Sequence, residues 1–201
     1  MLEFSYKILE VIILKILVET SARHIHFSEA DFLKLFGEDY IIKKKKDLSQ
    51  PGQFVCEERV TIEGPRGQIE RVSILGPFRD KTQVEISLTD SRKLGVVLYI
   101  RESGNLKGSS GCKIIGPAGE IILNEGVIIA KRHIHLDLQT AKSFDLKNNQ
   151  NVKVKIETKD RSLIFDDVIV RVSENYSPIF HIDTDESNAA GIEGQIFGEI
   201  L

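Results

Sequence analysis

The tetrapeptide Arg-His-Ile-His occurs twice in this 201-residue chain, at residues 23–26 and 132–135. The two copies contain four of the five histidines. Residues i and i+2 of a β-strand point to the same face, so each copy would present two imidazoles side by side, as a metal ion requires. The duplication indicates two related halves, each with its own histidine pair.

Similar residues follow both copies. Ser28 has the spacing of a capping box, with Asp31 three residues later, before a short apolar helix that ends at Gly37. After the second copy, Asp137 is placed to cap a matching helix. The stretch 15–22, in front of the first copy, is predicted to be a strand. Each half is therefore expected to run from a strand through His-x-His into a short helix.

The remaining segments are rich in apolar alternation and turns. Strands are predicted within 60–75, 112–123, 152–157 and 163–172, with turns such as Gly64–Gly67. Many short strands joined by regular turns are typical of small barrels or sandwiches. We therefore expect a mainly β (α+β) fold with a few short helices.

Composition and local charge narrow the class of protein. The net charge of −3 and the pI of about 6.0 argue against a nucleic-acid partner, and the first three lysines of Lys43–Lys46 are expected to lie in a solvated loop. Residues 1–14 have the spacing of an amphipathic helix, either a packing or dimer element or a targeting peptide, but charges interrupt them too often for a membrane span. Cys56 and Cys112 indicate reduced thiols in the cytoplasm.

A second parallel supplies a third ligand for each histidine pair. Glu85 lies in a short apolar segment before Gly95, and His181 lies in a similar segment before Gly191. The two glycines are 96 positions apart (191 − 95), and so are Glu85 and His181 (181 − 85). The fifth histidine is therefore the repeat partner of a glutamate.

The repeat predicts two metal sites with three protein ligands each. We call them the mixed set, which is His24, His26 and Glu85, and the histidine set, which is His133, His135 and His181. Three nitrogen or oxygen ligands with an open fourth position are typical of catalytic zinc, although imidazole also suits other transition metals. Such metals act as Lewis acids and orient two reactants, and anionic substrates such as phosphate suit them.

Three arginines accompany the predicted ligands. Arg79 precedes Glu85 by six residues (85 − 79) and is the candidate anion ligand, because guanidinium binds phosphate in a forked geometry. Its alternative role is ordinary surface charge. Arg23 and Arg132 directly precede the histidine pairs and would face away from the next residue in a strand, so structural salt bridges are expected for them.

Five segments together resemble the PduL-type phosphotransacylases, a family also called phosphate propanoyltransferases. They are residues 21–28, 46–54, 81–87, 132–135 and 181–189. The resemblance implies two β-barrel domains related by an internal repeat, each capped by short helices. We place the halves at 15–110 and 111–201, with an exchange of strands across this boundary left open. The reaction implied is the reversible conversion of acyl-CoA and phosphate into acyl phosphate and CoA, with a propanoyl or acetyl group.

The same resemblance implies a site and partners. It assigns two zinc ions per chain to the mixed and histidine sets, and phosphate to Arg79. Lys46, Ser103 and Asn188 fall near positions that contact CoA. We expect a cytoplasmic homodimer without nucleic-acid or membrane partners. Some family members are cargo of bacterial microcompartments, and the shortness of segment 1–14 leaves residence inside such a shell open.

Two rival functions remain at this stage. A di-metal hydrolase of a phosphate ester or thioester would use the same ligands with water as the nucleophile, so the dependence of CoA release on phosphate separates it from a transferase. A non-catalytic zinc-binding or shell-interaction protein would need closed four-ligand sites, which three ligands per half disfavour.

Overall fold

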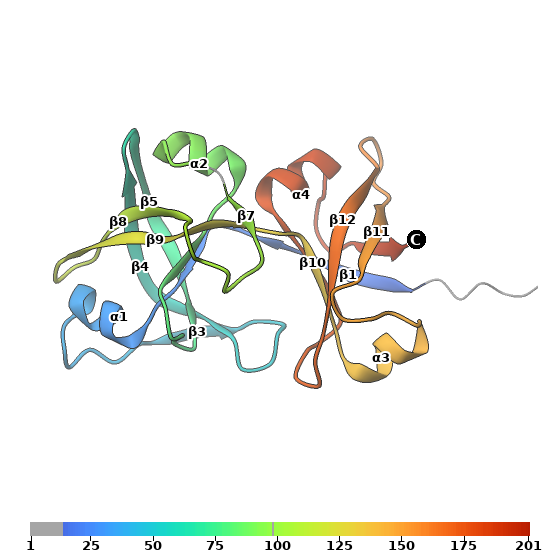
Figure 1. Cartoon of the computed structure of the whole chain (residues 1–201), viewed down its shortest axis with the longest axis horizontal. Helices are drawn as coiled ribbons and strands as arrows, with labels where there is room; N and C mark the ends of the chain where they lie inside the picture. Colours follow the sequence, from blue (N-terminus) through green and yellow to red (C-terminus); the bar gives the residue numbers. More distant parts are fainter. Residues whose placement is uncertain (1–13, 98) are drawn as a thin grey trace, which may run out of the picture.

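The computed structural model describes residues 14–97 and 99–201, which form fourteen strands and four helices. Two β-barrels lie side by side, with two short helices packed against each (Figure 1). The expected mainly β fold with two barrels and short helices is therefore confirmed. The amphipathic helix predicted for the N-terminal segment lies outside the described residues.

The first barrel is closed by a ring of strand pairings. Its strands are β2 (His24–His26), β4 (Phe54–Gly64), β5 (Gly67–Gly76), β6 (Gln83–Glu85), β8 (Ser110–Ile115) and β9 (Glu120–Ala130). The ring runs from β4 through β5, β2, β6, β9 and β8 back to β4. Two short strands extend it at its margins, β3 (Lys44–Asp47) along β4 and β7 (Ile100–Arg101) along β9.

The second barrel has the same number of strands in its ring. Its strands are β1 (Lys15–Ser21), β10 (His133–Leu136), β11 (Asn151–Ile156), β12 (Leu163–Val172), β13 (Ile179–Asp183) and β14 (Phe197–Ile200). They close in the order β1, β13, β10, β12, β11, β14. In both barrels the His-x-His strand pairs in parallel with one neighbour, β5 or β12, and antiparallel with the other, β6 or β13.

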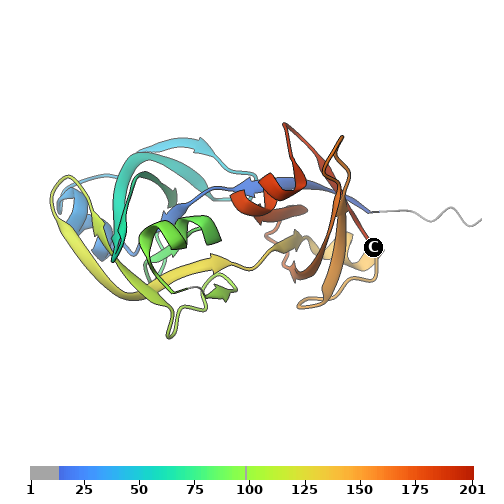
Figure 2. The same cartoon turned by 90° about the horizontal axis from the view of Figure 1, so that it is seen from above.

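The barrels exchange one strand each. Strand β1 leads into the first histidine pair along the chain, yet it pairs with β13 and β14 of the second barrel. Strand β9 leads into the second histidine pair, yet it pairs with β6 and β8 of the first barrel. The strand pairings therefore change barrel between β9 and β10, rather than at the predicted boundary after residue 110. Both crossing strands run between the barrels (Figure 2).

Four short helices cover the barrels at matched positions. They are α1 (Glu29–Phe36), α2 (Leu88–Leu94), α3 (Leu138–Ser143) and α4 (Thr184–Ala190). The predicted caps of α1 and α3 are confirmed, because Ser28 accepts a hydrogen bond from the Asp31 amide and Asp137 accepts one from the Thr140 amide. The carboxylate of Asp31 turns instead to the hydroxyl of Thr82, at 2.7 Å. A reciprocal capping box is found in α4.

Backbone conformation follows the repeat seen in the sequence. Helices α2 and α4 end at Gly95 and Gly191, which have left-handed φ values of 76° and 61°; glycine adopts such angles at little cost. Arg71 in β5 and Asp167 in β12 also have positive φ values, 57° and 54°, and they too are 96 positions apart (167 − 71). The offset of 96 residues therefore relates β5 and α2 of the first barrel to β12 and α4 of the second, whereas the histidine pairs are 109 positions apart (133 − 24).

Burial determines which way the histidines point. Ile25 and Ile134, which stand between the histidines of each pair, are fully buried in two separate barrel cores. Side chains alternate along a strand, so the neighbouring imidazoles face away from the cores. Burying an isoleucine contributes about 1.5–3 kcal/mol, and a slip of one residue would replace it by two histidines, so the register is strongly specified.

Three smaller features bear on the expectations from sequence. Lys43 precedes the edge strand β3 as expected for a loop, but Lys44 and Lys45 lie in that strand, an arrangement in which lysines discourage pairing with another chain. Cys56 and Cys112 are free thiols buried in the first core. None of the helices in the described part of the chain is long and apolar enough to span a membrane.

Candidate metal centre

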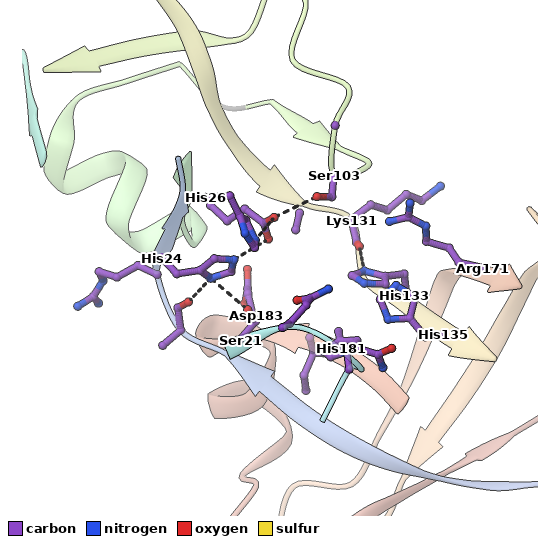
Figure 3. Close-up of a pocket in the computed structure, with 18 of the residues that line it drawn as sticks. Ser21, His24, His26, Ser103, Lys131, His133, His135, Arg171, His181 and Asp183 are labelled. Carbon is purple, nitrogen blue, oxygen red and sulfur yellow. Dashed lines mark hydrogen bonds and ion pairs between the residues drawn. The ribbon is translucent and has the colours of Figure 1, made fainter. Parts of the chain in front are cut away.

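The two predicted ligand sets face a common cavity between the barrels. In each set the potential ligand atoms lie within 4.8 Å of one another. Both sets line one cavity of about 270 Å³, which we call the central cavity, and the two sets face each other across it (Figure 3). Strand alternation brings the two histidines of each pair together, and pairing with β6 or β13 adds the third residue.

The mixed set is built by one antiparallel pairing. His24 in β2 lies directly opposite Glu85 in β6. Nε2 of His24 is 3.5 Å from Oε2 of Glu85, and Nε2 of His26 is 4.0 Å from Oε1. Nδ1 of His24 donates to the carbonyl oxygen of Ala22 at 2.8 Å. That hydrogen bond places the proton on Nδ1 and leaves the Nε2 lone pair free for a metal.

The histidine set repeats this construction in the second barrel. His133 in β10 lies opposite His181 in β13, at the register position that Glu85 holds in the first barrel. The ring centroid of His135 is 4.7 Å from that of His133 and 5.1 Å from that of His181. Nδ1 of His133 donates to the carbonyl oxygen of Lys131 at 2.9 Å, as His24 does to Ala22. The repeat therefore preserves the orientation of the first imidazole as well as its position.

Unpartnered nitrogens support metal binding at the histidine set. Among the described residues, Nδ1 of His135 and Nε2 of His181 are buried and have no hydrogen-bond partner. A buried polar atom left without a partner costs roughly 1–3 kcal/mol. Coordination of a metal to the imidazoles would offset this cost. The donor set of imidazoles with one carboxylate fits zinc.

The charge states of His135, His181 and Glu85 also suit a metal. Burial, with a contribution from His133, lowers the pKa of His135 to about 2 and that of His181 to about 3, so both imidazoles remain neutral. Burial alone would raise the pKa of Glu85, but His24 and the other nearby cationic groups hold that pKa well below its usual range. Burial lowers the pKa of His24, but the negative charge of Glu85 and its hydrogen bond to His24 raise that pKa by more, so the pKa of His24 is raised overall. The mixed set thus carries an ionised carboxylate.

Arg79, the candidate anion ligand, lies at the edge of the mixed set. Its Nη2 donates to Nε2 of His26 at 2.8 Å, and its Nη1 donates to Oγ of Ser103 at 3.0 Å. Ser103 in turn donates to Oε1 of Glu85 at 3.2 Å and accepts from Nε2 of Gln83 at 2.9 Å. Ser103 therefore connects the guanidinium of Arg79 to the mixed set.

The other predicted site residues lie in different places. Lys46 lines a second pocket of about 420 Å³, the side pocket, which adjoins the central cavity at His24 and His181. Ser103 lines the central cavity but not the side pocket. Asn188 is exposed on α4 and lines neither.

The arginines before the histidine pairs form ion pairs outside the ligand sets. Arg23 pairs with Asp90 of α2 at 2.8 Å, and Arg132 pairs with Glu186 of α4 at 3.0 Å. The two acids are also related by the repeat offset of 96 (186 − 90). Each pair ties a His-x-His strand to the helix after the third ligand, which is the structural role expected from the sequence.

Several residues of the cavity had escaped sequence reasoning. The ring of Tyr176 packs on His135, with centroids 4.1 Å apart. Gln50 reaches across from the first barrel, donating to the carbonyl oxygen of Ser177 at 2.9 Å and accepting from its amide. Arg171 also lines the cavity. For Arg171 the repeat offset does identify a partner position, Leu75 beside the first histidine pair, but the two residues differ in type, so a search for matching residues did not find it.

These features define a double-barrel protein in which two candidate metal sites and an arginine share one cavity. Residues 17–193 match the model of the phosphate propanoyltransferase family, and the chain belongs to that family. Its predicted enzyme class, an acyltransferase that uses phosphate, is thereby confirmed.

Relatives named phosphate propanoyltransferase are similar over most of their length. The Thermotoga maritima protein is 52% identical over 175 residues, which cover 87% of this chain and 83% of the relative. The Clostridioides difficile protein is 48% identical over 184 residues, or 92% of this chain and 88% of the relative. The Shewanella putrefaciens protein is 52% identical over 174 residues, or 87% and 82%.

Proposed function

We propose that this chain catalyses the reversible reaction of acyl-CoA with phosphate to give acyl phosphate and CoA, with a propanoyl or acetyl group, at a two-zinc site. The observation that carries the proposal is the meeting of both ligand sets and Arg79 in one cavity. A reaction between two anionic substrates needs positive charge and two adjacent binding positions, and this cavity offers both.

The mixed set would hold one zinc ion and the histidine set the other. When bound, two zinc ions with open positions would supply Lewis-acid chemistry, which stabilises anionic oxygen and the thiolate leaving group. The protein's own contribution is to hold the donors in place. Carbonyl oxygens fix the first imidazole of each pair, and the barrel cores fix the strand register beneath them.

Arg79 would orient the phosphate. Two of its N–H groups are used by His26 and Ser103, which leaves others free to donate to an anion in the cavity. The backbone N–H of Arg79 donates to the carbonyl oxygen of Phe27 at 2.8 Å. This hydrogen bond fixes the backbone from which the guanidinium extends. A phosphate oxygen directed at the thioester carbonyl carbon then forms the new C–O bond while the C–S bond breaks and CoA leaves as a thiolate.

The side pocket would take part of CoA. Its wall includes Lys45, Lys46 and Arg59, whose charges suit the phosphates of a nucleotide. It adjoins the central cavity beside His24 and His181, so a ligand in the side pocket could extend its thiol end towards the ligand sets. Lys46 therefore keeps its proposed CoA contact, whereas Ser103 is better placed to orient Arg79.

Phosphate itself would be the nucleophile, since the chain offers no reactive thiol. Burial raises the pKa of Cys56 and of Cys112 to about 12, so neither forms a thiolate near neutral pH. Both lie in the core of the first barrel and neither lines the central cavity. The family resemblance further supports a cytoplasmic homodimer; a role for residues 1–14 in a microcompartment remains a prediction of the sequence.

Release of CoA from acetyl-CoA and propanoyl-CoA, with and without phosphate, tests the proposal. We expect release to require phosphate, and we expect acyl phosphate to be trapped as a hydroxamate with hydroxylamine. A longer acyl-CoA series would give the preferred chain length. Equal CoA release without phosphate, and no hydroxamate, would contradict the proposal and favour the di-metal hydrolase.

A further inference from the structure

Arg171 brings a second guanidinium into the central cavity from the other barrel. It lies in β12, directly beside His135 of β10 in the parallel register. Its neighbour Val170 is buried in the second core, so alternation directs Arg171 outwards, towards the ligand sets. Figure 3 shows it next to His133 and His135, across the cavity from His24 and His26.

This guanidinium has no anionic partner in the part of the chain that the structure describes. Arg23 and Arg132 each pair with an acid, but Arg171 forms neither an ion pair nor a side-chain hydrogen bond with any described residue. It is only partly exposed. A half-buried cation without a protein acceptor, facing a cavity, is suited to an anion that enters from solution.

The barrel does not need a cation at this position. The repeat partner of Arg171 is Leu75 (171 − 75 = 96), which lies beside His26 in the same register that Arg171 has beside His135. The first barrel therefore forms its closed ring with a leucine at this position. A function in ligand binding therefore explains the arginine better than a function in folding.

Two positive charges also oppose each other across the cavity. Both guanidiniums line the central cavity, Arg79 beside His26 of the mixed set and Arg171 beside His135 of the histidine set. Bringing two guanidiniums together costs free energy unless an anion lies between them.

We propose that Arg171 is a second phosphate-binding residue, which holds the phosphate group of the substrate from the side of the histidine set while Arg79 holds it from the side of the mixed set. This proposal rests on the proposed function. A phosphate dianion has acceptor oxygens enough for two forked guanidinium contacts, and two contacts from opposite barrels fix its direction as one cannot. The same residue would hold the phosphate of acyl phosphate in the reverse reaction.

The test compares Arg171→Leu, Arg171→Lys and a control, Arg92→Leu. Leucine is the residue that the first barrel holds at this position, and Arg92 is an exposed arginine of α2 that lines neither pocket. Three quantities are measured: inorganic phosphate binding to the zinc-loaded protein by calorimetry, KM for phosphate and for acyl-CoA, and zinc content. We expect Arg171→Leu to weaken phosphate binding and to raise its KM by about 10- to 100-fold. The KM for acyl-CoA should change by less than about 3-fold, and zinc content should not change.

The lysine variant should recover part of the loss, because it restores the charge without the fork. Arg92→Leu should behave as the original protein. Unchanged phosphate affinity in Arg171→Leu, or loss of zinc in place of phosphate, would overturn the proposal. If the original protein binds phosphate but releases no CoA, the proposed function fails, and the calorimetric comparison alone still decides the role of Arg171.

Discussion

The two halves of the cavity have one scaffold but different chemistry. In each, a His-x-His strand lies opposite a third ligand at the same register position. The mixed set has a carboxylate there and is hydrogen-bonded to Ser103 and Gln83. The histidine set has an imidazole there, an aromatic ring on His135, and two unpartnered nitrogens among the described residues.

This difference shows how duplication can produce two distinct sites. The barrel determines where each side chain lies, and the residue type at two positions determines the chemistry. The third ligand is Glu85 in one barrel and His181 in the other. The neighbour of the second histidine is Leu75 in one barrel and Arg171 in the other. An anionic ligand lowers the positive charge of a bound metal, whereas an all-imidazole set does not. A metal held by the histidine set would therefore be the more electrophilic of the two.

Removing a single ligand should have the largest effect. His24→Ala and His135→Ala should each lower the zinc content by about one ion per chain and reduce phosphate-dependent CoA release by about 1,000-fold or more, since metal stabilisation supplies several kcal/mol. Metal analysis and turnover on the same sample check this. Full zinc content in either variant would contradict the assignment of that ligand set.

Exchanging the third ligands should have a smaller effect. Glu85→His and His181→Glu each keep three donors, so zinc should remain bound, but turnover should fall by about 10- to 100-fold because the supporting contacts no longer match the ligand. The double exchange should not restore turnover, since Arg79, Ser103 and Gln83 remain on the side of the mixed set. Normal turnover in both single variants would show that the asymmetry of the two sets is irrelevant to catalysis.

The stability of the metal-free protein should fall in mild acid, because of the histidine set. His135 takes up a proton near pH 6.5 in the unfolded chain, but its pKa in the folded chain is about 2. Between these values the unfolded state binds more protons, so the free energy of unfolding decreases as the pH falls. His135→Asn should remove about 1.4 kcal/mol per pH unit of this dependence between pH 5.5 and 4.5. Urea unfolding at several pH values measures it, and an unchanged slope would refute the buried neutral state.

The smallest effect is expected at the ion pairs outside the ligand sets. Side chains of Arg132 and Glu186 are 28% and 22% exposed, so Arg132→Met should lower the free energy of unfolding by about 1 kcal/mol or less. Zinc content and the KM for phosphate should stay the same. A large rise in that KM would show that Arg132 serves the substrate and not only the fold.

The ligand sets were readable from sequence because they depend on two local rules. Alternation along a strand pairs His24 with His26, and the offset of 96 residues then identifies Glu85 with His181. The exchange of β1 and β9 was not readable, because a strand's own residues do not specify which barrel it joins. Tyr176 escaped because a single aromatic residue in a loop carries no pattern. Arg171 was not predicted because its repeat partner is Leu75, and a comparison of the two halves that looks for matching residue types does not identify such a position.

Titration of zinc into metal-stripped protein tests the central claim most directly, with phosphate-dependent CoA release measured at each step. Two ligand sets in one cavity predict that binding saturates at two ions per chain and that turnover rises chiefly with the second ion. Full turnover in the metal-free protein, or saturation of both binding and turnover at one ion, would contradict the account.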